Sequence, residues 1–225
     1  MSGDTPRSPT PGGGPLQVLQ EQAVASLAPI EKPLRRVGDR FADAGWEIAL
    51  VGGPVRDALL GRLGSDTDLD FTTNAQPEQI VELLDGWAEA VWDVGIRFGT
   101  VGARIDGREV EITTYRSESY DAPSRKPEVA FGDNLAADLA RRDFTMNAMA
   151  VTLPSMEFVD LFDGIADLAA KRIRTPGTTQ SSFDDDPLRM MRAARFASQL
   201  DAHNKDTAAG LVSNAAFDML EIESQ

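Results

Sequence analysis

Short apolar runs alternate with helical stretches through the middle of the chain, from Trp46 to Ile173. Runs such as Ile48 to Val51 have the length and composition of buried strands. Before them, Leu16 to Ala44 predicts one or two amphipathic helices, interrupted around Pro29 and Pro33. The pattern therefore predicts an α+β fold, in which helices flank a mixed or antiparallel sheet.

Other segments depart from this alternation. Residues 1–15 are rich in Pro, Gly, Ser and Thr, which predicts a disordered tail. Residues 115–133 predict a long loop, and long loops inside compact domains are usually functional or disordered. Residues 182–200 predict one helix whose acidic start suits the helix dipole, and residues 204–221 predict the start of another. We therefore expect four parts: a tail (1–15), N-terminal helices (16–45), a central domain (46–174) and a helical region (175–225).

The composition narrows the possible classes of function. With 225 residues and 42% hydrophobic content, the chain can bury a core in one or two domains. Cysteine is absent and His203 is the only histidine, which disfavours thiol catalysis, a Ser-His-Asp triad, zinc ligation and disulfides. No apolar run approaches the roughly 20 residues of a membrane span, and residues 1–15 lack a signal-peptide core. We therefore expect a cytoplasmic protein with no membrane partner.

Two glycines follow the first predicted strand. Gly52 and Gly53 let the backbone turn tightly into a helix opened by Pro54. Free amides at such a helix start would face a triphosphate, with Arg56 as a charged partner on the first turn. Because a glycine pair is more often a plain turn, this signal depends on what accompanies it.

A pair of aspartates follows a short helix later. Asp68 and Asp70 lie two apart in a predicted second strand, so their carboxylates project to one side, roughly 6.6 Å apart along the strand. Such a pair can hold two Mg²⁺ ions about 4 Å apart, one activating an attacking hydroxyl and the other bridging phosphates. Together with the glycine turn, the pair indicates nucleotidyl transfer.

Three other interpretations of these residues differ in strength. An EF-hand starting at Asp66 would put Phe71 where glycine is needed and Pro77 where the bidentate glutamate belongs. A P-loop is excluded because the chain has no Gly-Lys-Ser/Thr. Residues 68–72 also resemble the aspartyl-nucleophile motif of haloacid-dehalogenase-like phosphatases, which carry it on their first strand, whereas here a strand and a helix precede it. The rest of the chain decides between transferase and phosphatase.

Two long motifs later in the chain favour the transferase. Arg-Arg-Asp-Phe-Thr-Met-Asn-Ala-Met-Ala spans 141–150, and Asp-Asp-Pro-Leu-Arg-Met-Met-Arg-Ala-Ala-Arg-Phe spans 185–196. In order after Gly-Gly-Pro-Val-Arg-Asp and Asp-Leu-Asp, they closely resemble the class II CCA-adding tRNA nucleotidyltransferase and bacterial poly(A) polymerase family. Residues 111–116 and 124–129 also look like the family's strand and flexible loop. The resemblance implies a nucleotidyltransferase head at 46–174, followed by an all-α neck.

The resemblance implies a set of site residues. The implied metal ligands are Asp68 and Asp70, which gives a two-metal Mg²⁺ site. Glu111 is a candidate third carboxylate on a neighbouring strand, and Glu109 shares its face and stays an alternative. The implied contacts to the nucleotide are Gly52, Gly53, Arg56 and Arg142.

The resemblance also implies how bases are chosen without a nucleic-acid template. Asp186 and Arg189 match the Asp and Arg that the family uses as a template, and at i and i+3 of one helix they share a face. The carboxylate accepts from the exocyclic amine of cytosine or adenine and the guanidinium donates to the ring nitrogen, whereas uracil and guanine present a carbonyl. Arg192 and Arg195 match further nucleotide contacts, or form a solvated helix face. Asp185 stands where many relatives carry Glu, and we expect it to act as a helix cap.

The net charge of −14 is unusual for a protein expected to bind tRNA. Either the basic surface is local, or it lies on a part that the chain lacks, since family members carry body and tail regions after the head. We therefore expect a head with the beginning of a neck, which adds CMP and AMP from CTP and ATP to the 3′ end of tRNA. A poly(A) polymerase and a catalytically silent RNA-associated domain are the alternatives, and the oligomeric state is open.

Overall fold

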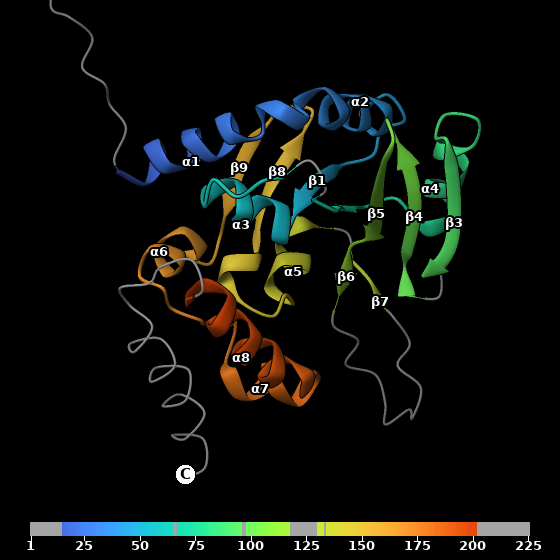
Figure 1. The fold of residues 1–225 in the computed structure, drawn as a ribbon. Coiled ribbons are helices and arrows are strands. Elements are labelled where there is room, and N and C mark those ends of the chain that lie inside the picture. The colour runs from blue at the N-terminus through green and yellow to red at the C-terminus, as the bar shows by residue number, and fades with distance from the viewer. Residues whose placement is uncertain (1–14, 65–66, 96–97, 118–129, 133, 202–225) are drawn as a thin grey trace, which may run out of the picture.

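The computed structural model describes residues 15–64, 67–95, 98–117, 130–132 and 134–201. A seven-stranded sheet with helices on both faces forms the body of the protein (Figure 1), so the predicted α+β fold is confirmed. The predicted tail up to residue 14, most of the 115–133 loop and the predicted helix at 204–221 lie outside the described residues. Within the described part of the chain, no helix is both long and apolar enough to cross a membrane.

The sheet is mixed, as the sequence predicts. Its strand order is β3-β4-β5-β2-β1-β8-β9. β2 and β5 run parallel, and all other neighbours run antiparallel. The strands are β1 (Ile48–Val51), β2 (Leu69–Thr73), β3 (Ala90–Gly95), β4 (Thr100–Ile105), β5 (Arg108–Thr114), β8 (Met149–Leu153) and β9 (Glu157–Asp160), with a separate two-stranded ladder of β6 (Arg116–Ser117) and β7 (Ala130–Phe131).

One face of the sheet is covered by α2 (Glu31–Ala42) and α4 (Pro77–Leu84). The helical repeat places Leu34, Val37 and Phe41 of α2 on one side, where all three are buried. They join the alternate residues of the strands that point to this face and so form the main core. α1 (Pro15–Ser26) and the 3-10 helix η1 (Ala28–Ile30) precede α2 and extend the same layer.

The predicted N-terminal helices are confirmed, with one correction. The chain is interrupted at Pro29, which lies in η1. Pro33 causes no break, because it lies in the first turn of α2, where the missing N–H would have no intrahelical partner.

The opposite face of the sheet is covered only in part. α5 (Leu135–Ala140) packs Leu139 against Ala49 and Ala150 of β1 and β8. On β5, Val110 and Ile112 are buried, while Glu109 and Glu111, which alternate with them, are exposed. The same alternation places Asp70 of β2 on this face beside Glu111.

The predicted single helix at 182–200 is wrong. The structure has two helices, α7 (Thr179–Asp185) and α8 (Leu188–Asp201). Pro187 disfavours the helical conformation for Asp186, which has φ −146° and ψ 97°. The Asp186 Oδ1 accepts a hydrogen bond from the Leu188 N–H at 3.0 Å, so Asp186 and Pro187 begin a new helix.

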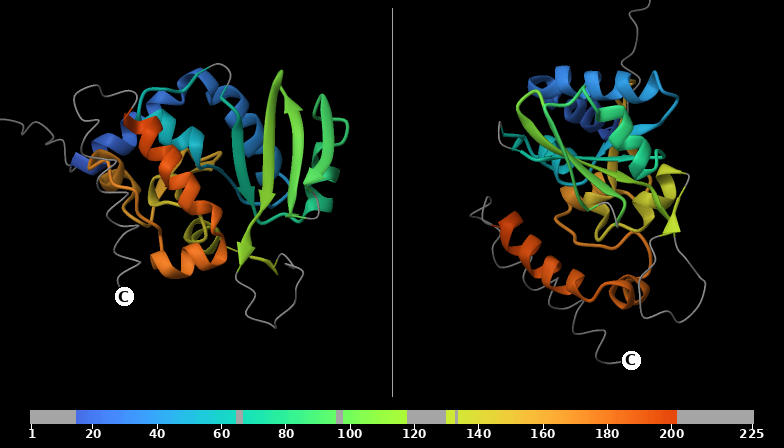
Figure 2. Two further views of the ribbon diagram at one scale, coloured as in Figure 1. Left: turned by 60° about the horizontal axis from the view of Figure 1, so that its bottom comes forward. Right: turned by 90° about the vertical axis from the view of Figure 1, so that its right-hand side faces the viewer.

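The helices α7 and α8 lie on the other side of the molecule from α1 and α2 (Figure 2). α8 packs Phe196 and Ala193 against Phe144, Met146 and Leu168 of the head. The rings of Phe144 and Phe196 meet edge to face, with centroids 5.8 Å apart. The remaining elements are α3 (Gly53–Leu59), η3 (Thr145–Asn147) and α6 (Gly164–Ala169).

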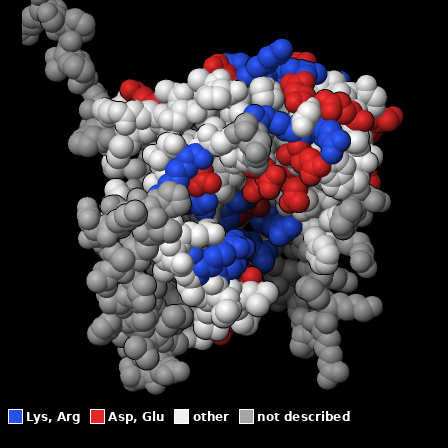
Figure 3. Space-filling view, viewed as in Figure 1, with Lys and Arg blue, Asp and Glu red and all other residues white. Residues whose placement is uncertain are grey.

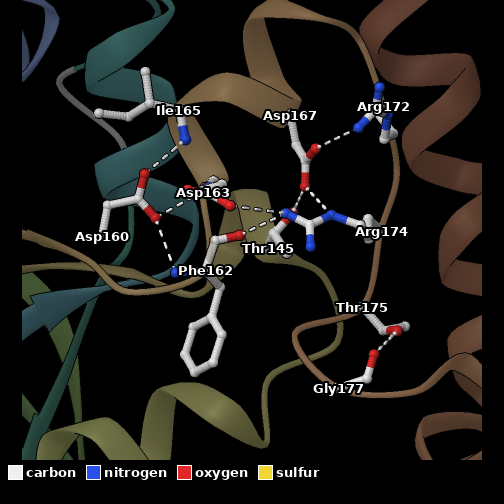
Figure 4. A network of polar contacts seen from close by, with 11 residues as sticks. Thr145, Asp160, Phe162, Asp163, Ile165, Asp167, Arg172, Arg174, Thr175 and Gly177 are labelled. Carbon is white, nitrogen blue, oxygen red and sulfur yellow. Dashed lines mark hydrogen bonds and ion pairs between the residues drawn. The ribbon is translucent and has the colours of Figure 1, made fainter. Parts of the chain in front are cut away.

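A polar network fixes the segment that leads into α7 (Figure 4). The buried carboxylate of Asp167 accepts hydrogen bonds from the Thr145 hydroxyl and from Arg174 Nε, both at 2.7 Å. The Thr145 N–H also donates to the Arg174 carbonyl at 2.7 Å. Since these bonds tie the segment to η3, they help to set the position of α7 and α8 beneath the sheet.

Candidate active site

The carboxylates predicted from the sequence converge on the open face of the sheet. Parallel pairing of β2 with β5 places Glu111 directly beside Asp70. Asp68 precedes β2 by one residue, and it lines one hollow of about 320 Å³ together with Asp70, Glu111 and Glu109. Glu109 also forms an ion pair with Arg104 at 2.8 Å. Glu111, the direct neighbour of Asp70, is therefore the better candidate for the third carboxylate.

Asp70 carries an unusually unfavourable charge. Burial, followed by the negative charge of Glu111, raises the pKa of Asp70 from 3.8 to about 6. Arg142 opposes this shift, and Asp68 adds to it. The cluster thus lacks positive charge, which a divalent cation would supply.

The all-oxygen donor set fits a hard divalent cation such as Mg²⁺. Mg²⁺ prefers carboxylate oxygens and usually binds through one or two of them together with water and substrate phosphates. Within the described ranges, no group of three or more Asp, Glu, His or Cys side chains forms a ready-made metal site. Asp68 and Asp70 therefore fit an ion that is completed by a bound nucleotide.

The glycine turn brings the start of α3 against this cluster. Gly52 has φ +74°, a conformation that side chains rarely adopt. A Cβ at Gly52 would lie 3.1 Å from Arg142 Nη1 and 3.8 Å from Asp70 Oδ2. Glycine at this position thus lets the backbone approach both the aspartate and the arginine, as the sequence predicts for a phosphate contact.

A basic cavity of about 320 Å³ adjoins the carboxylates. Asp70 and Glu111 form one side of it, and Arg116, Arg141 and Arg142 contribute the positive charge. Figure 3 shows basic and acidic side chains gathered next to one another around a hollow. The cavity thus brings both charges that a metal-bound triphosphate requires into one place.

Two arginines of this cavity have unsatisfied donors. The Nε atoms of Arg116 and Arg142 are buried and have no hydrogen-bond partner. Arg142 Nη2 donates to Asp138 at 3.2 Å, and Arg116 Nη2 donates to the Phe98 carbonyl at 2.9 Å. Burial lowers the pKa of Arg116, Asp138 opposes this, and Arg141 and Arg142 add to it. An anion would therefore be favourable here, since it would relieve the repulsion and accept from the free donors.

Sequence reasoning assigned no role to Arg116 or Asp138. Asp138 holds Arg142 and also accepts from the Arg116 N–H at 3.2 Å, so it joins two segments of the cavity wall. The available signal was an arginine directly after a predicted strand, but only the folded chain shows that Arg116 meets α5.

Arg56 lies outside both hollows. It donates to Asn147 Oδ1 at 2.8 Å, pairs with Asp57 at 2.9 Å and stacks over the Phe196 ring at 5.2 Å. These contacts hold α3 against η3 and α8. A phosphate contact by Arg56, which the sequence predicts, would require it to exchange these partners.

The basic residues of α8 also have internal partners. Arg192 pairs with the buried Asp143 at 2.7 Å, and Arg195 lies over the Phe196 ring at 4.9 Å. Neither residue lines the basic cavity or the acidic hollow. Their predicted nucleotide contacts stay predictions.

Asp186 and Arg189 do not share a helix face, because Asp186 precedes α8 and caps its start. Arg189 donates to Ser182 Oγ at 2.6 Å and to the carbonyl of Arg141 at 2.7 Å, and Arg141 in turn lines the basic cavity. Asp185 was expected to cap a helix, but it is the last residue of α7. Its carboxylate instead lies 3.4 Å from Arg189 and 3.7 Å from Arg141.

Replacing Asp70 with Asn is expected to stabilise the metal-free protein at pH 7.5. The carboxyl keeps its proton up to about pH 6 in the folded state but releases it near 3.8 when unfolded. The wild type therefore loses stability as the pH rises through this range, whereas Asp70→Asn does not. Denaturant unfolding in EDTA at pH 4 and 7.5, with the exposed Asp39→Asn as control, measures the difference. A variant no more stable than the wild type at pH 7.5 would contradict the charge assignment.

Comparison with known proteins identifies the family to which the chain belongs. The family model described as the poly A polymerase head domain matches residues 48–174. The CCA-adding enzyme of Lactobacillus helveticus is 49% identical over 159 residues, which covers 70% of this chain and 38% of that protein. The CCA-adding enzyme of Enterococcus faecalis is 46% identical over 158 residues, which covers 70% of this chain and 37% of that protein.

Solved structures of proteins with similar names also resemble this chain. The crystal structure of the Bacillus stearothermophilus CCA-adding enzyme in complex with CTP matches with a TM-score of 0.61 and 33% identity, over 83% of this chain and 40% of that one. A tRNA nucleotidyltransferase complexed with a primer tRNA and an incoming ATP analog matches with a TM-score of 0.58 and 35% identity, over 73% of this chain and 45% of that one. The chain thus spans less than half the length of these proteins.

Proposed function

This chain belongs to the poly(A) polymerase head domain family, whose model matches more than half of it, and from that premise we propose that it is a tRNA nucleotidyltransferase. It adds CMP and AMP from CTP and ATP to the 3′ end of tRNA and releases pyrophosphate. The observation that carries the proposal is the cavity in which Asp70 and Glu111 face three arginines. A tRNA substrate would put the reaction in the cytoplasm.

Asp68 and Asp70 would hold the two Mg²⁺ ions, with Glu111 as a further ligand. When bound, the metal supplies Lewis-acid activation of the attacking 3′-hydroxyl and neutralises charge on the phosphates. The raised pKa of Asp70 supports this role, because that carboxylate has the most to gain from a cation.

The triphosphate would lie between the glycine turn and the basic cavity. The unpartnered Nε atoms of Arg116 and Arg142 supply donors to phosphate oxygens, and Gly52 and Gly53 bring the backbone close to the same place. Pyrophosphate leaves as a polyanion, so Arg142 stabilises the charge that develops on it. A basic surface confined to this cavity would be compatible with a net charge of −14, and Figure 3 shows the basic side chains gathered there beside acidic ones.

Base choice is assigned to Asp186 and Arg189. Arg189 has five N–H donors, and its bonds to Ser182, to the Arg141 carbonyl and to Asp185 hold it in one orientation. A contact to a base would use a remaining donor or replace one of these partners. Cytosine and adenine offer an amine and a ring nitrogen to such a pair, whereas uracil and guanine do not.

Arg189→Ala is expected to relax the choice of base more than it slows the reaction. Loss of one bidentate contact lowers discrimination against UTP and GTP by about 10-fold to 100-fold. Competition between labelled nucleotides measures this ratio, and Arg35→Ala, an exposed arginine on α2, serves as the matched control. Full preference for CTP and ATP in the Arg189→Ala variant would refute the template role.

The proposal is tested with a tRNA that lacks its terminal CCA. The chain is incubated with Mg²⁺ and labelled CTP and ATP, separately and together, and the products are resolved at single-nucleotide length. Two C residues followed by one A support the proposal. Release of phosphate in place of pyrophosphate would indicate a phosphatase, and no addition would favour a catalytically silent domain.

A poly(A) polymerase is the second candidate, because the matching family model is described by that activity. The two functions share the carboxylates and the basic cavity, so the site does not separate them. Repeated AMP addition without CMP addition, seen as a ladder in the same assay, would identify the polymerase.

A further inference from the structure

Trp92 ends a row of residues that crosses the open face of the sheet. The strand register places Glu111 beside Asp70, Gly102 beside Glu111, and Trp92 beside Gly102. Neighbouring strands lie about 4.8 Å apart, so the row spans about 15 Å from β2 to the edge strand β3. The carboxylate pair and the tryptophan therefore lie on one line across the sheet, with only a glycine between them.

The indole of Trp92 folds back over that glycine. A Cβ added to Gly102 would lie 2.6 Å from the indole Cδ1 and would also collide with Nε1. Only glycine at position 102 therefore leaves room for the ring above β4. The half-buried Trp92 lines the same hollow as Asp68, Asp70 and Glu111, so the ring is a wall of the acidic side of the site.

The geometry of phosphoryl transfer indicates which substrate lies next to the Trp92 ring. The attacking and leaving oxygens lie roughly in line on opposite sides of the phosphorus. Gly52 and Arg142 approach Asp70 from one side and are assigned to the triphosphate. The attacking 3′-hydroxyl must then arrive from the other side of Asp70, where Trp92 lies with Asp68 in the acidic hollow.

The charges of the acidic hollow select which part of the RNA it accepts. Asp68 and Glu109 lie in its wall beside Asp70 and Glu111, and the residues that line it include no Lys or Arg, so a backbone phosphate finds no basic partner there. A nucleobase is uncharged and has a π-face, so it stacks on an aromatic ring whatever its identity. This tolerance suits an acceptor whose last nucleotide changes after every addition.

We propose that Trp92 stacks on the terminal base of the RNA acceptor and thereby holds the 3′-hydroxyl at the carboxylates, an inference that rests on the function proposed above. The Trp92 indole is thus a stacking platform, and Gly102 makes this platform possible because it leaves space for the ring. The partner is the terminal nucleoside of the RNA, and the incoming nucleotide stays on the opposite side of Asp70.

The kinetic test separates the RNA acceptor from the nucleotide. Trp92→Ala is expected to raise the KM for tRNA by about 10-fold to 100-fold and to leave the KM for CTP within about twofold. Trp92→Phe keeps an aromatic ring and retains a KM for tRNA close to that of the wild type. Val91→Ala, on the other face of β3, is the matched control for folding. An unchanged KM for tRNA in Trp92→Ala would overturn the proposal.

A binding test makes the inference independent of activity. A short oligoribonucleotide ending in C-C is expected to quench tryptophan fluorescence in the wild type and much less in Trp92→Phe, because Trp46 and Trp87 pack against the core. Quenching by a protein that adds no nucleotide would preserve the platform and refute the proposed function. Equal quenching in the wild type and in Trp92→Phe would overturn the platform, whatever the activity.

Discussion

Asp70→Ala is expected to lower nucleotide incorporation at saturating Mg²⁺ by about a thousandfold or more. The change removes a metal ligand, and the several kcal/mol of charge stabilisation that a metal supplies correspond to such a factor. Because Asp70 is held in an unfavourable charge state, its loss should not unfold the protein. Single-turnover incorporation of labelled CTP, with a thermal melt of the same sample, measures both properties. Mg²⁺-dependent activity retained by the variant would refute the site.

The same assay identifies the third carboxylate. Glu111→Gln is expected to reduce incorporation strongly, because Glu111 lies directly beside Asp70 in the register. Glu109→Gln is the matched control, since Glu109 is already paired with Arg104. The reverse order of effects would move the third ligand to Glu109.

Arg142→Ala is expected to lower kcat by about 100-fold to 1,000-fold, as the removal of one donor to a developing oxyanion does. Arg142 lines the basic cavity, approaches Gly52 and carries an unpartnered buried Nε. Arg142→Lys should recover little, because a lysine lacks the planar fork of donors. Single-turnover rates with CTP provide the measurement, and Arg62→Ala, at an exposed position after α3, is the control. An Arg142→Ala variant with wild-type kcat would exclude this arginine from phosphate binding.

The local sequence pattern was sufficient to predict the fold class and the shared face on which the carboxylates lie. Strand alternation places Glu109 and Glu111 on one face of β5, and parallel pairing with β2 brings Glu111 to Asp70. The alternation is a property of the strand itself, so it can be read from the sequence. Which strand pairs with β2, however, depends on the whole sheet.

The wrong prediction of one helix at 182–200 arose where a backbone restriction overrides periodicity, and long-range contacts also escape a local pattern. The apolar pattern of 182–200 predicts one helix, but Pro187 ends α7 and makes Asp186 the cap of α8. Arg56 and Arg192 look like free basic groups in the sequence, yet Asn147 and the buried Asp143 bind them in the fold. Such partners lie 91 and 49 positions away, and no local pattern reveals them.

The basic cavity also depends on contacts between residues that lie far apart in the sequence. Arg116 begins β6 and Arg142 follows α5, and their shared partner Asp138 joins them only after folding. Trp92 is similar, because its position depends on Gly102 of the neighbouring strand. Non-local positions therefore complete the candidate site whose carboxylates the sequence predicts.

The most direct test is a crystal structure of this chain with Mn²⁺ in place of Mg²⁺ and a non-hydrolysable CTP analogue, with the manganese located by anomalous scattering. The predicted result is manganese bound by Asp68 and Asp70 and a triphosphate within hydrogen-bond distance of Arg142. Manganese at other residues, or a nucleotide outside the basic cavity and the glycine turn, would contradict the proposed site.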